Sequence, residues 1–105
     1  MIEIKFYEHM TRYSITVKGH DELAPRGQNI VCAAVSALVQ CYSNYIAEHA
    51  DDIPIRVLEN KTDEGDANID VDNYERDYGF PDLYYMIKEG LIDIAKSCPG
   101  RVKIL

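Results

Sequence analysis

The sequence predicts a small α+β fold, in which an antiparallel or mixed sheet in the order ββαββαβ carries two helices packed on one face. Three observations lead to this prediction. Apolar and polar residues alternate with period two near the N-terminus and again in the middle of the chain. Two longer segments carry apolar residues at helical spacing, and short polar segments, rather than helical crossovers, join most strands. The 105 residues, 47% of them hydrophobic, are enough for one core, so residues 1–105 are expected to form a single domain.

The first element is predicted to be a β-hairpin. Residues 1–8 and 12–18 each alternate apolar and polar side chains, and residues 9–11 between them are typical of a turn. Two half-buried strands therefore open the fold.

A loop and a long helix follow the hairpin. Residues 19–28 include Pro25 and Gly27, which argue against regular structure and favour an exposed loop. Asn29 is a good N-cap for a helix over residues 30–48. The apolar stripe of this helix is predicted to include Ala34, Ala37, Leu38, Cys41 and Tyr45.

The second half repeats the pattern of a hairpin followed by a helix. Residues 53–58 and 67–71 are predicted strands, joined through residues 61–66. A helix is expected over residues 82–97, since Pro81 suits a first turn and Pro99 with Gly100 ends the segment. Residues 101–105 are expected to form the last strand.

The composition excludes several classes of protein. The longest apolar run, residues 30–39, contains Ser36 and ends at Gln40, so no membrane-spanning segment is expected. The first residues lack a basic start followed by an apolar block, so no secretory signal is expected and the protein is placed in the cytoplasm. The net charge of −7 opposes nucleic-acid binding and suits a basic protein or peptide partner.

The three cysteines, Cys32, Cys41 and Cys98, form no CxxC pair, so neither a disulfide framework nor a zinc ribbon is expected. Acidic residues gather between positions 63 and 72, but without the DxDxDG spacing of a calcium loop. They are interpreted as a solvated turn and strand face, and neither a metal nor another cofactor is expected.

Cys32 is the candidate nucleophile. It lies in the first turn of the helix predicted at residues 30–48, where unpaired amides and the helix dipole stabilise a thiolate. On a helical wheel its neighbours are Ser36, Val39 and Ser43, whereas Cys41 lies roughly opposite, where it suits a small core residue. The alternative is that Cys32 is a buried small hydrophobe, the more common use of cysteine in an apolar segment.

His20 is the candidate general base, because an imidazole near its ordinary pKa can accept a thiol proton and residues 21–28 are long enough to bring it back to the helix start. Asn29 could orient the imidazole, as an amide does in Cys-His-Asn sites. The exposed amides of Val31, Cys32 and Ala33 are natural donors to an oxyanion. The alternative for His20 is a simple turn residue; His9 and His49 are interpreted as surface residues.

The motif Gly19-His20, then Gly27 and the run Ile-Val-Cys-Ala-Ala-Val-Ser-Ala-Leu over residues 30–38, resembles the signature of the ribosomal-processing cysteine protease (Prp, or YsxB-like) family. The resemblance implies that Cys32 is the nucleophile, that His20 is its base and that Ser36 is a supporting polar residue. It also implies a loop that covers the substrate, comprising Gly19, Asp21, Glu22, Leu23, Ala24, Pro25, Arg26, Gly27 and Gln28. The sequence departs from the family at Asn29, where members usually carry an acidic residue.

The resemblance further implies a homodimeric endopeptidase that removes a short N-terminal segment from a large-subunit ribosomal protein after an aromatic pair. Phage-encoded relatives act on capsid or scaffold proteins with a similar segment, so both substrate classes stay open. An amide at position 29 cannot stabilise an imidazolium by charge. The alternative function is therefore an adaptor of the same fold, with weakened or lost activity, that binds such a protein.

Overall fold

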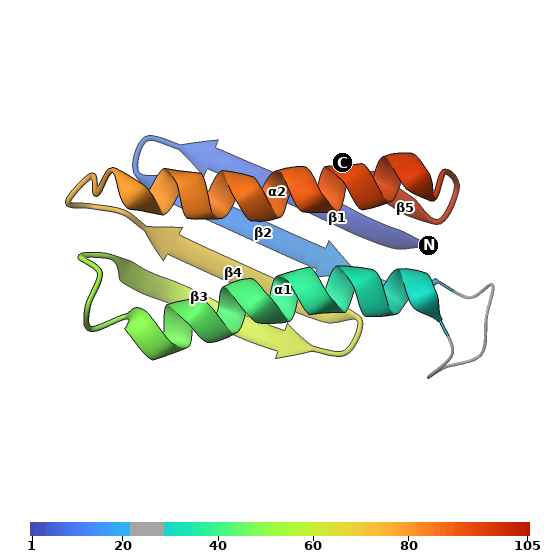
Figure 1. The fold of residues 1–105 in the computed structure, drawn as a ribbon, viewed down its shortest axis with the longest axis horizontal. Coiled ribbons are helices and arrows are strands. Elements are labelled where there is room, and N and C mark those ends of the chain that lie inside the picture. The colour runs from blue at the N-terminus through green and yellow to red at the C-terminus, as the bar shows by residue number, and fades with distance from the viewer. Residues whose placement is uncertain (22–28) are drawn as a thin grey trace.

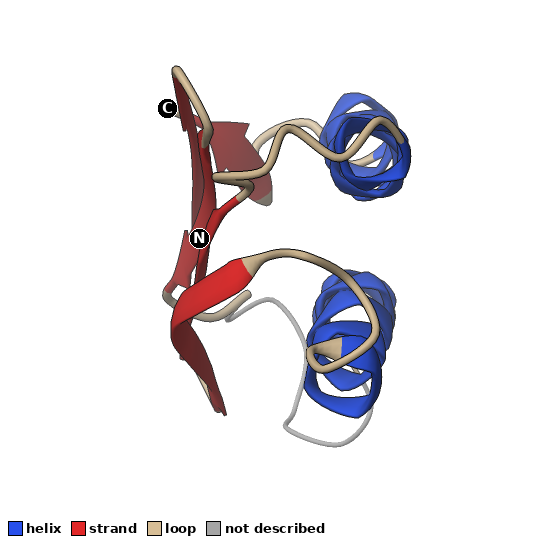
Figure 2. Ribbon diagram, turned by 90° about the vertical axis from the view of Figure 1, so that its left-hand side faces the viewer, coloured by secondary structure: helices blue, strands red, loops and turns tan. Residues whose placement is uncertain are grey.

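The computed structural model describes residues 1–21 and 29–105, which form one five-stranded mixed sheet and two helices. In chain order the elements are β1 (Ile2–His9), β2 (Arg12–Lys18), α1 (Ile30–His49), β3 (Arg56–Asp63), β4 (Asp66–Asp72), α2 (Gly79–Ser97) and β5 (Val102–Ile104). The strand order is β3-β4-β2-β1-β5, and only the β1–β5 pair is parallel. Both helices lie on the same face of the sheet (Figure 2). The predicted fold class and element order are confirmed.

The core lies between the sheet and the two helices. The alternation in the strands places one apolar row against the helices, and the register pairs Ile4 with Val17 and Ile15 with Ile69. These four side chains are at most 7% exposed. Burying each contributes about 1.5–3 kcal/mol to folding, so the strand register is strongly determined by this face.

Helix α1 buries a different face from the one predicted. Its buried apolar side chains are Val31, Val35, Val39, Tyr42 and Ile46. The stripe predicted through Cys41 and Tyr45 was wrong, because Cys41 is exposed and Tyr45 is 41% exposed. Apolar residues cover most of the circumference of this helix, and the larger and β-branched side chains are the ones that pack on the sheet.

Two boundaries also differ from the prediction. Residues 53–55 form a turn, closed by the Ile55 amide donating to the Ile53 carbonyl at 2.8 Å, so β3 begins three residues later and continues to Asp63. Helix α2 begins at Gly79 because the Asp77 carboxylate accepts hydrogen bonds from the first amides, Gly79 and Phe80, each at 3.1 Å. Because β3 continues to Asp63 and β4 begins at Asp66, the connection between them is the two-residue turn Glu64-Gly65.

Helix α1 is, by length and composition, apolar enough to cross a membrane. The apolar run itself ends at Val39, but the polar residues that follow it in this window of the helix, Gln40, Ser43 and Asn44, are uncharged. A third of the window, 33%, is buried inside the structure. A core helix of a soluble protein passes the same test, so this property is weak support for a membrane segment.

The ends of three elements meet at one end of the molecule. Figure 1 shows the end of β2, the β3–β4 turn and the start of α1 close together. The Gly19 amide donates to the Gly65 carbonyl at 3.0 Å, which ties the end of β2 to that turn.

Candidate active site

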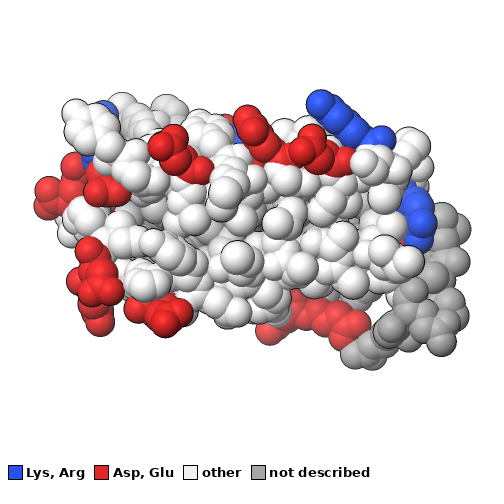
Figure 3. Space-filling model, viewed as in Figure 1, with Lys and Arg blue, Asp and Glu red and all other residues white. Residues whose placement is uncertain are grey.

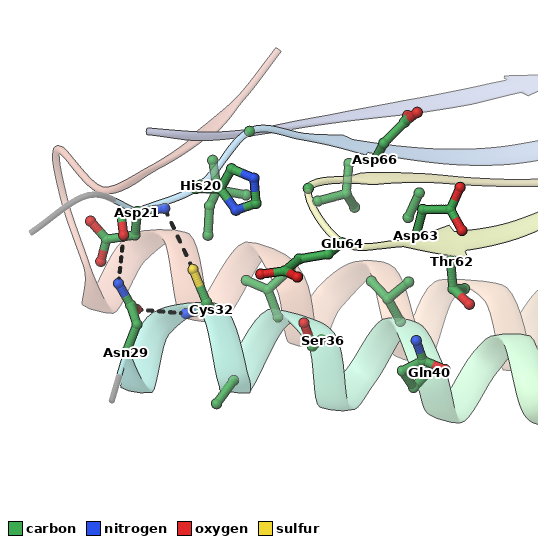
Figure 4. A pocket seen from close by; sticks show the side chains of 18 residues that line it. His20, Asp21, Asn29, Cys32, Ser36, Gln40, Thr62, Asp63, Glu64 and Asp66 are labelled. Atoms are coloured by element: carbon green, nitrogen blue, oxygen red, sulfur yellow. Dashed lines mark hydrogen bonds between the residues drawn. The ribbon is translucent and has the colours of Figure 1, made fainter. Parts of the chain in front are cut away.

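A pocket of about 810 Å³ opens where these three elements meet. Its lining includes His20, Asn29, Cys32, Ser36 and Glu64. Figure 4 shows that these side chains come from the segment after β2, the first half of α1 and the β3–β4 turn. The two residues expected to perform the chemistry, Cys32 and His20, therefore line the same cavity.

Cys32 is positioned by the start of α1. Asn29 is the N-cap, so Cys32 is the third residue of the helix, where the positive end of the helix dipole stabilises a thiolate. Its side chain packs partly against the core, and the thiol lines the pocket. The Asp21 amide donates to Sγ at 3.4 Å. Cys32 is thus not sealed in the core, and its sulfur accepts a hydrogen bond that also stabilises the thiolate.

Asn29 caps the helix, as predicted, but does not orient His20. Its Oδ1 accepts from the Cys32 amide at 2.9 Å, and its Nδ2 donates to the Asp21 carbonyl at 2.7 Å. The side chain is buried, with 8% exposure, and these two bonds direct its amide toward the helix start and the Asp21 backbone. The expectation that Asn29 orients the imidazole is therefore corrected: it joins the Asp21 backbone to the start of the helix.

The cap also changes the expectation for the oxyanion donors. The Cys32 amide donates to the Asn29 side chain, and the Ala33 amide donates to the Asn29 carbonyl at 3.0 Å. Two of the three expected amides are therefore engaged inside the cap. Among bonds between described residues, the Val31 amide donates to no acceptor outside the helix.

Asp21 has a structural role that its place in the sequence does not predict. It was expected in an exposed substrate loop, but it is only 5% exposed. The Arg101 guanidinium donates to its carboxylate, with Nε to Oδ2 at 2.6 Å. This hydrogen bond raises the pKa of Arg101. The pair holds the Asp21 amide against Cys32, and no local pattern signals a partner 80 positions away.

His20 is exposed and lies between the end of β2 and the β3–β4 turn. Gly19 makes this possible: it has φ +93°, and a Cβ there would lie 2.5 Å from the Met1 carbonyl oxygen. A Cβ on Gly65 would lie 2.3 Å from Nε2 of His20, so the imidazole packs directly on that glycine. Figure 4 shows the ring and the Cys32 sulfur on the same side of the pocket.

Ser36 lines the pocket one turn after Cys32, as the helical wheel predicted. The expected substrate-loop residues Glu22, Leu23, Ala24, Pro25, Arg26, Gly27 and Gln28 lie outside the described residues.

Cys41 does not occupy the core position predicted for it. All three cysteines are free thiols, and Cys41 is exposed whereas Cys32 and Cys98 are partly buried. Exposure alone therefore does not distinguish the proposed nucleophile, and any measurement of thiol reactivity has to separate Cys32 from Cys41.

Carboxylates surround the outer part of the pocket. Asp66 binds Lys18 and Lys61, which lower its pKa to about 2. Asp63 lies 3.8 Å from Nζ of Lys61. In the part of the chain that the structure describes, no group of three or more His, Cys, Asp or Glu residues is placed to hold a metal ion.

A family model described as the cysteine protease Prp matches residues 1–103. A search of curated proteins finds no match. Among solved structures, a protein of Streptococcus mutans is 26% identical, with a TM-score of 0.69, and the alignment covers 100% of this chain and 94% of that chain.

Two further structures are of the essential ribosomal processing protease Prp from S. aureus. The complex with a covalently linked product peptide has a TM-score of 0.79 at 18% identity and covers 99% of this chain and 97% of that chain. The complex with a substrate peptide has a TM-score of 0.73 at 15% identity and covers 100% and 98%. These two likenesses show a shared fold.

Proposed function

Because this chain belongs to the cysteine protease Prp family, we propose that it removes a short N-terminal segment from a large-subunit ribosomal protein, cleaving after an aromatic pair. The activity class follows from the family. The ribosomal substrate is suggested by the S. aureus relative, a ribosomal processing protease, and the N-terminal segment and the aromatic pair are what the resemblance of the sequence implies. A protein with this substrate would act in the cytoplasm.

The observation that carries the proposal is the position of the Cys32 thiol. Sγ lies at the start of α1, 3.4 Å from the Asp21 amide, in the pocket that His20 also lines. A helix start and an amide donor both favour the thiolate over the thiol, and an adjacent imidazole can accept the proton. A cysteine used only for packing would need neither an amide donor to its sulfur nor an imidazole in the same pocket.

The mechanism follows from these positions. The Cys32 thiol transfers its proton to His20, and the thiolate attacks the carbonyl carbon of the scissile peptide bond. The negative charge moves to the carbonyl oxygen, for which we propose the Val31 amide as a donor, since it donates to no described acceptor outside the helix. His20 then protonates the leaving amine, the C–N bond breaks, and an acyl-enzyme remains. Water, deprotonated by His20, hydrolyses the thioester and restores the thiol.

A synthetic peptide tests the substrate. We expect cleavage after the aromatic pair of a peptide that represents the N-terminal segment of a ribosomal protein, detected by mass spectrometry of both products. The matched control peptide has the aromatic pair replaced by alanine and should be cleaved at least about tenfold more slowly, as expected when apolar pocket contacts are lost. Faster cleavage of a capsid or scaffold segment would replace the ribosomal substrate with a viral one. Binding without cleavage of either peptide would support the adaptor instead.

We also propose that the protein is a homodimer. Exposed apolar side chains lie on both helices, including Ile30, Tyr45 and Met86. Figure 3 shows that the helix-covered face carries charged side chains mainly at its edges. An uncharged face of this kind is typical of an interface. Light scattering at micromolar concentration should give twice the chain mass of 12.0 kDa, and a monomer mass would contradict the proposal.

A further inference from the structure

Arg101 is fixed by its backbone at the junction between α2 and β5. Its amide donates to the Cys98 carbonyl at 3.1 Å, and its carbonyl accepts from the Ile2 amide at 3.0 Å. Among the described residues, its side chain is not one of those that line the pocket. The guanidinium is therefore held outside the cavity that would receive a substrate.

The Asp21 carboxylate is the group that the guanidinium contacts. Nε of Arg101 donates to Oδ2 at 2.6 Å, and Nη2 forms an ion pair with the same oxygen. The Asp21 side chain is only 2% exposed, so the guanidinium takes the place of water around a buried charge. Hydrogen bonds between two charged groups are stronger than those between neutral groups. This pair therefore fixes the position of Asp21 from the C-terminal end of the chain.

The backbone of Asp21 connects this ion pair to the proposed nucleophile. Its amide donates to Sγ of Cys32 at 3.4 Å, and its carbonyl accepts from Nδ2 of Asn29 at 2.7 Å, as Figure 4 shows. The pKa of Arg101 is raised, first by its hydrogen bond to Asp21 and to a smaller extent by the charge of Cys32. The guanidinium therefore acts on Cys32 through Asp21 and also lies within electrostatic range of the thiol.

We propose that Arg101 is a positioning residue of the nucleophile, which holds Asp21 so that the Asp21 amide points at the Cys32 sulfur. The inference rests on the proposed function, in which this sulfur attacks the substrate. An N–H donor restrains the sulfur and favours the thiolate over the thiol. A small misplacement of a reacting atom slows a reaction strongly. Because Arg101 lies outside the pocket, its loss should lower kcat and leave KM nearly unchanged.

The NMR signal of the Asp21 amide tests the contact without a substrate. In Cys32→Ala this amide loses its acceptor, so its proton signal should move upfield. Arg101→Gln should move the signal in the same direction, because the amide is held less firmly against the sulfur. The Ile69 amide, in the centre of the sheet, should keep its signal. An unchanged Asp21 signal in Arg101→Gln, or an equally large change at Ile69, would overturn the positioning role.

The cleavage assay tests the consequence for the reaction. Arg101→Gln should lower kcat about five- to twentyfold and change KM by less than about twofold. Arg101→Lys keeps a positive charge opposite the buried carboxylate but lacks the forked donors, so it should recover part of the loss. An unchanged kcat in Arg101→Gln, or a loss confined to KM, would contradict the inference.

Asp21→Ala decides the outcome if Arg101→Gln does not fold. Removal of Arg101 leaves a buried carboxylate that has lost its guanidinium, which is strongly destabilising. Asp21→Ala removes that carboxylate and leaves Arg101, which is 31% exposed, to be hydrated. It breaks the same link, so kcat should fall to a similar extent. The double variant should be no slower than Asp21→Ala alone. Unchanged kcat in Asp21→Ala, or losses that multiply in the double variant, would overturn the inference.

The matched control is Arg12→Gln, which removes the hydrogen-bonded ion pair with Asp70 at the start of β2. The pocket lies beyond the other end of that strand. Both kcat and the Asp21 signal should equal those of the unmodified protein. Equal effects in Arg12→Gln and Arg101→Gln would show a general response to the loss of a surface cation and would overturn the positioning role.

The two proposals fail in different ways. If Cys32→Ala leaves cleavage unchanged, the proposed function fails, whatever the Asp21 signal shows. If the Cys32 and His20 variants lose activity as expected but Arg101→Gln keeps both kcat and the Asp21 signal, the function stands and only the role of Arg101 is lost.

Discussion

Replacing Cys32 with alanine is expected to lower kcat/KM for peptide cleavage by at least about 10³-fold, because the methyl group of alanine cannot attack the peptide carbonyl. The fold should survive. The side chain is only partly buried, and the substitution removes one sulfur atom, so the free energy of unfolding should change by about 1 kcal/mol. Activity is measured by the rate of product formation, and stability by thermal unfolding.

The control for this variant is Cys41→Ala, on the exposed side of the same helix. It should keep full activity, and cleavage by Cys32→Ala at the normal rate would rule out the mechanism. The same two cysteines allow a direct measurement of the thiolate. In a Cys41→Ser background, which removes the exposed thiol, iodoacetamide should label Cys32 at mildly acidic pH faster than Cys98.

Replacing His20 with alanine is expected to lower kcat/KM by about 10²–10⁴-fold, the range for loss of general acid and base catalysis. The loss should be smaller than for Cys32→Ala, because the helix start and the Asp21 amide still favour the thiolate. The imidazole is exposed, so the free energy of unfolding should change little.

His49→Ala is the control, since this imidazole lies at the far end of α1, next to Tyr45 and Asp52. It should leave kcat/KM unchanged. Added imidazole should partly restore the His20→Ala variant, because the pocket then has room for it beside Gly65. Full activity of His20→Ala without added imidazole would show that another group is the base.

The local sequence pattern was sufficient to predict the order of the strands and helices, but not which face of α1 is buried. Period-two alternation gave both hairpins, and Asn29 marked the start of α1. The buried face of α1 could not be read, because the helix offers a second apolar stripe through Cys41 and Tyr45. The sheet selects the stripe of Val31, Val35 and Val39, since these branched side chains fill the space between the layers.

In the candidate site, too, some features follow from local sequence and others depend on contacts between distant segments. The cap by Asn29 and the place of Cys32 in the first turn of α1 could be predicted, because each depends on residue type and on position relative to one helix start. The catalytic roles of Cys32 and His20 stay predictions. The Asp21–Arg101 pair and the packing of His20 on Gly65 could not be predicted, because each joins segments that are distant in the sequence.

The sequence by itself determined the alternation of strands and helices and the position of a thiol at a helix start, because hydrogen bonding and capping act over a few residues. The tertiary structure alone decided which side of α1 faces the sheet, which carboxylate is buried and which turn contacts the imidazole. Those outcomes depend on packing between elements, and packing selects among several faces and partners that are locally equivalent.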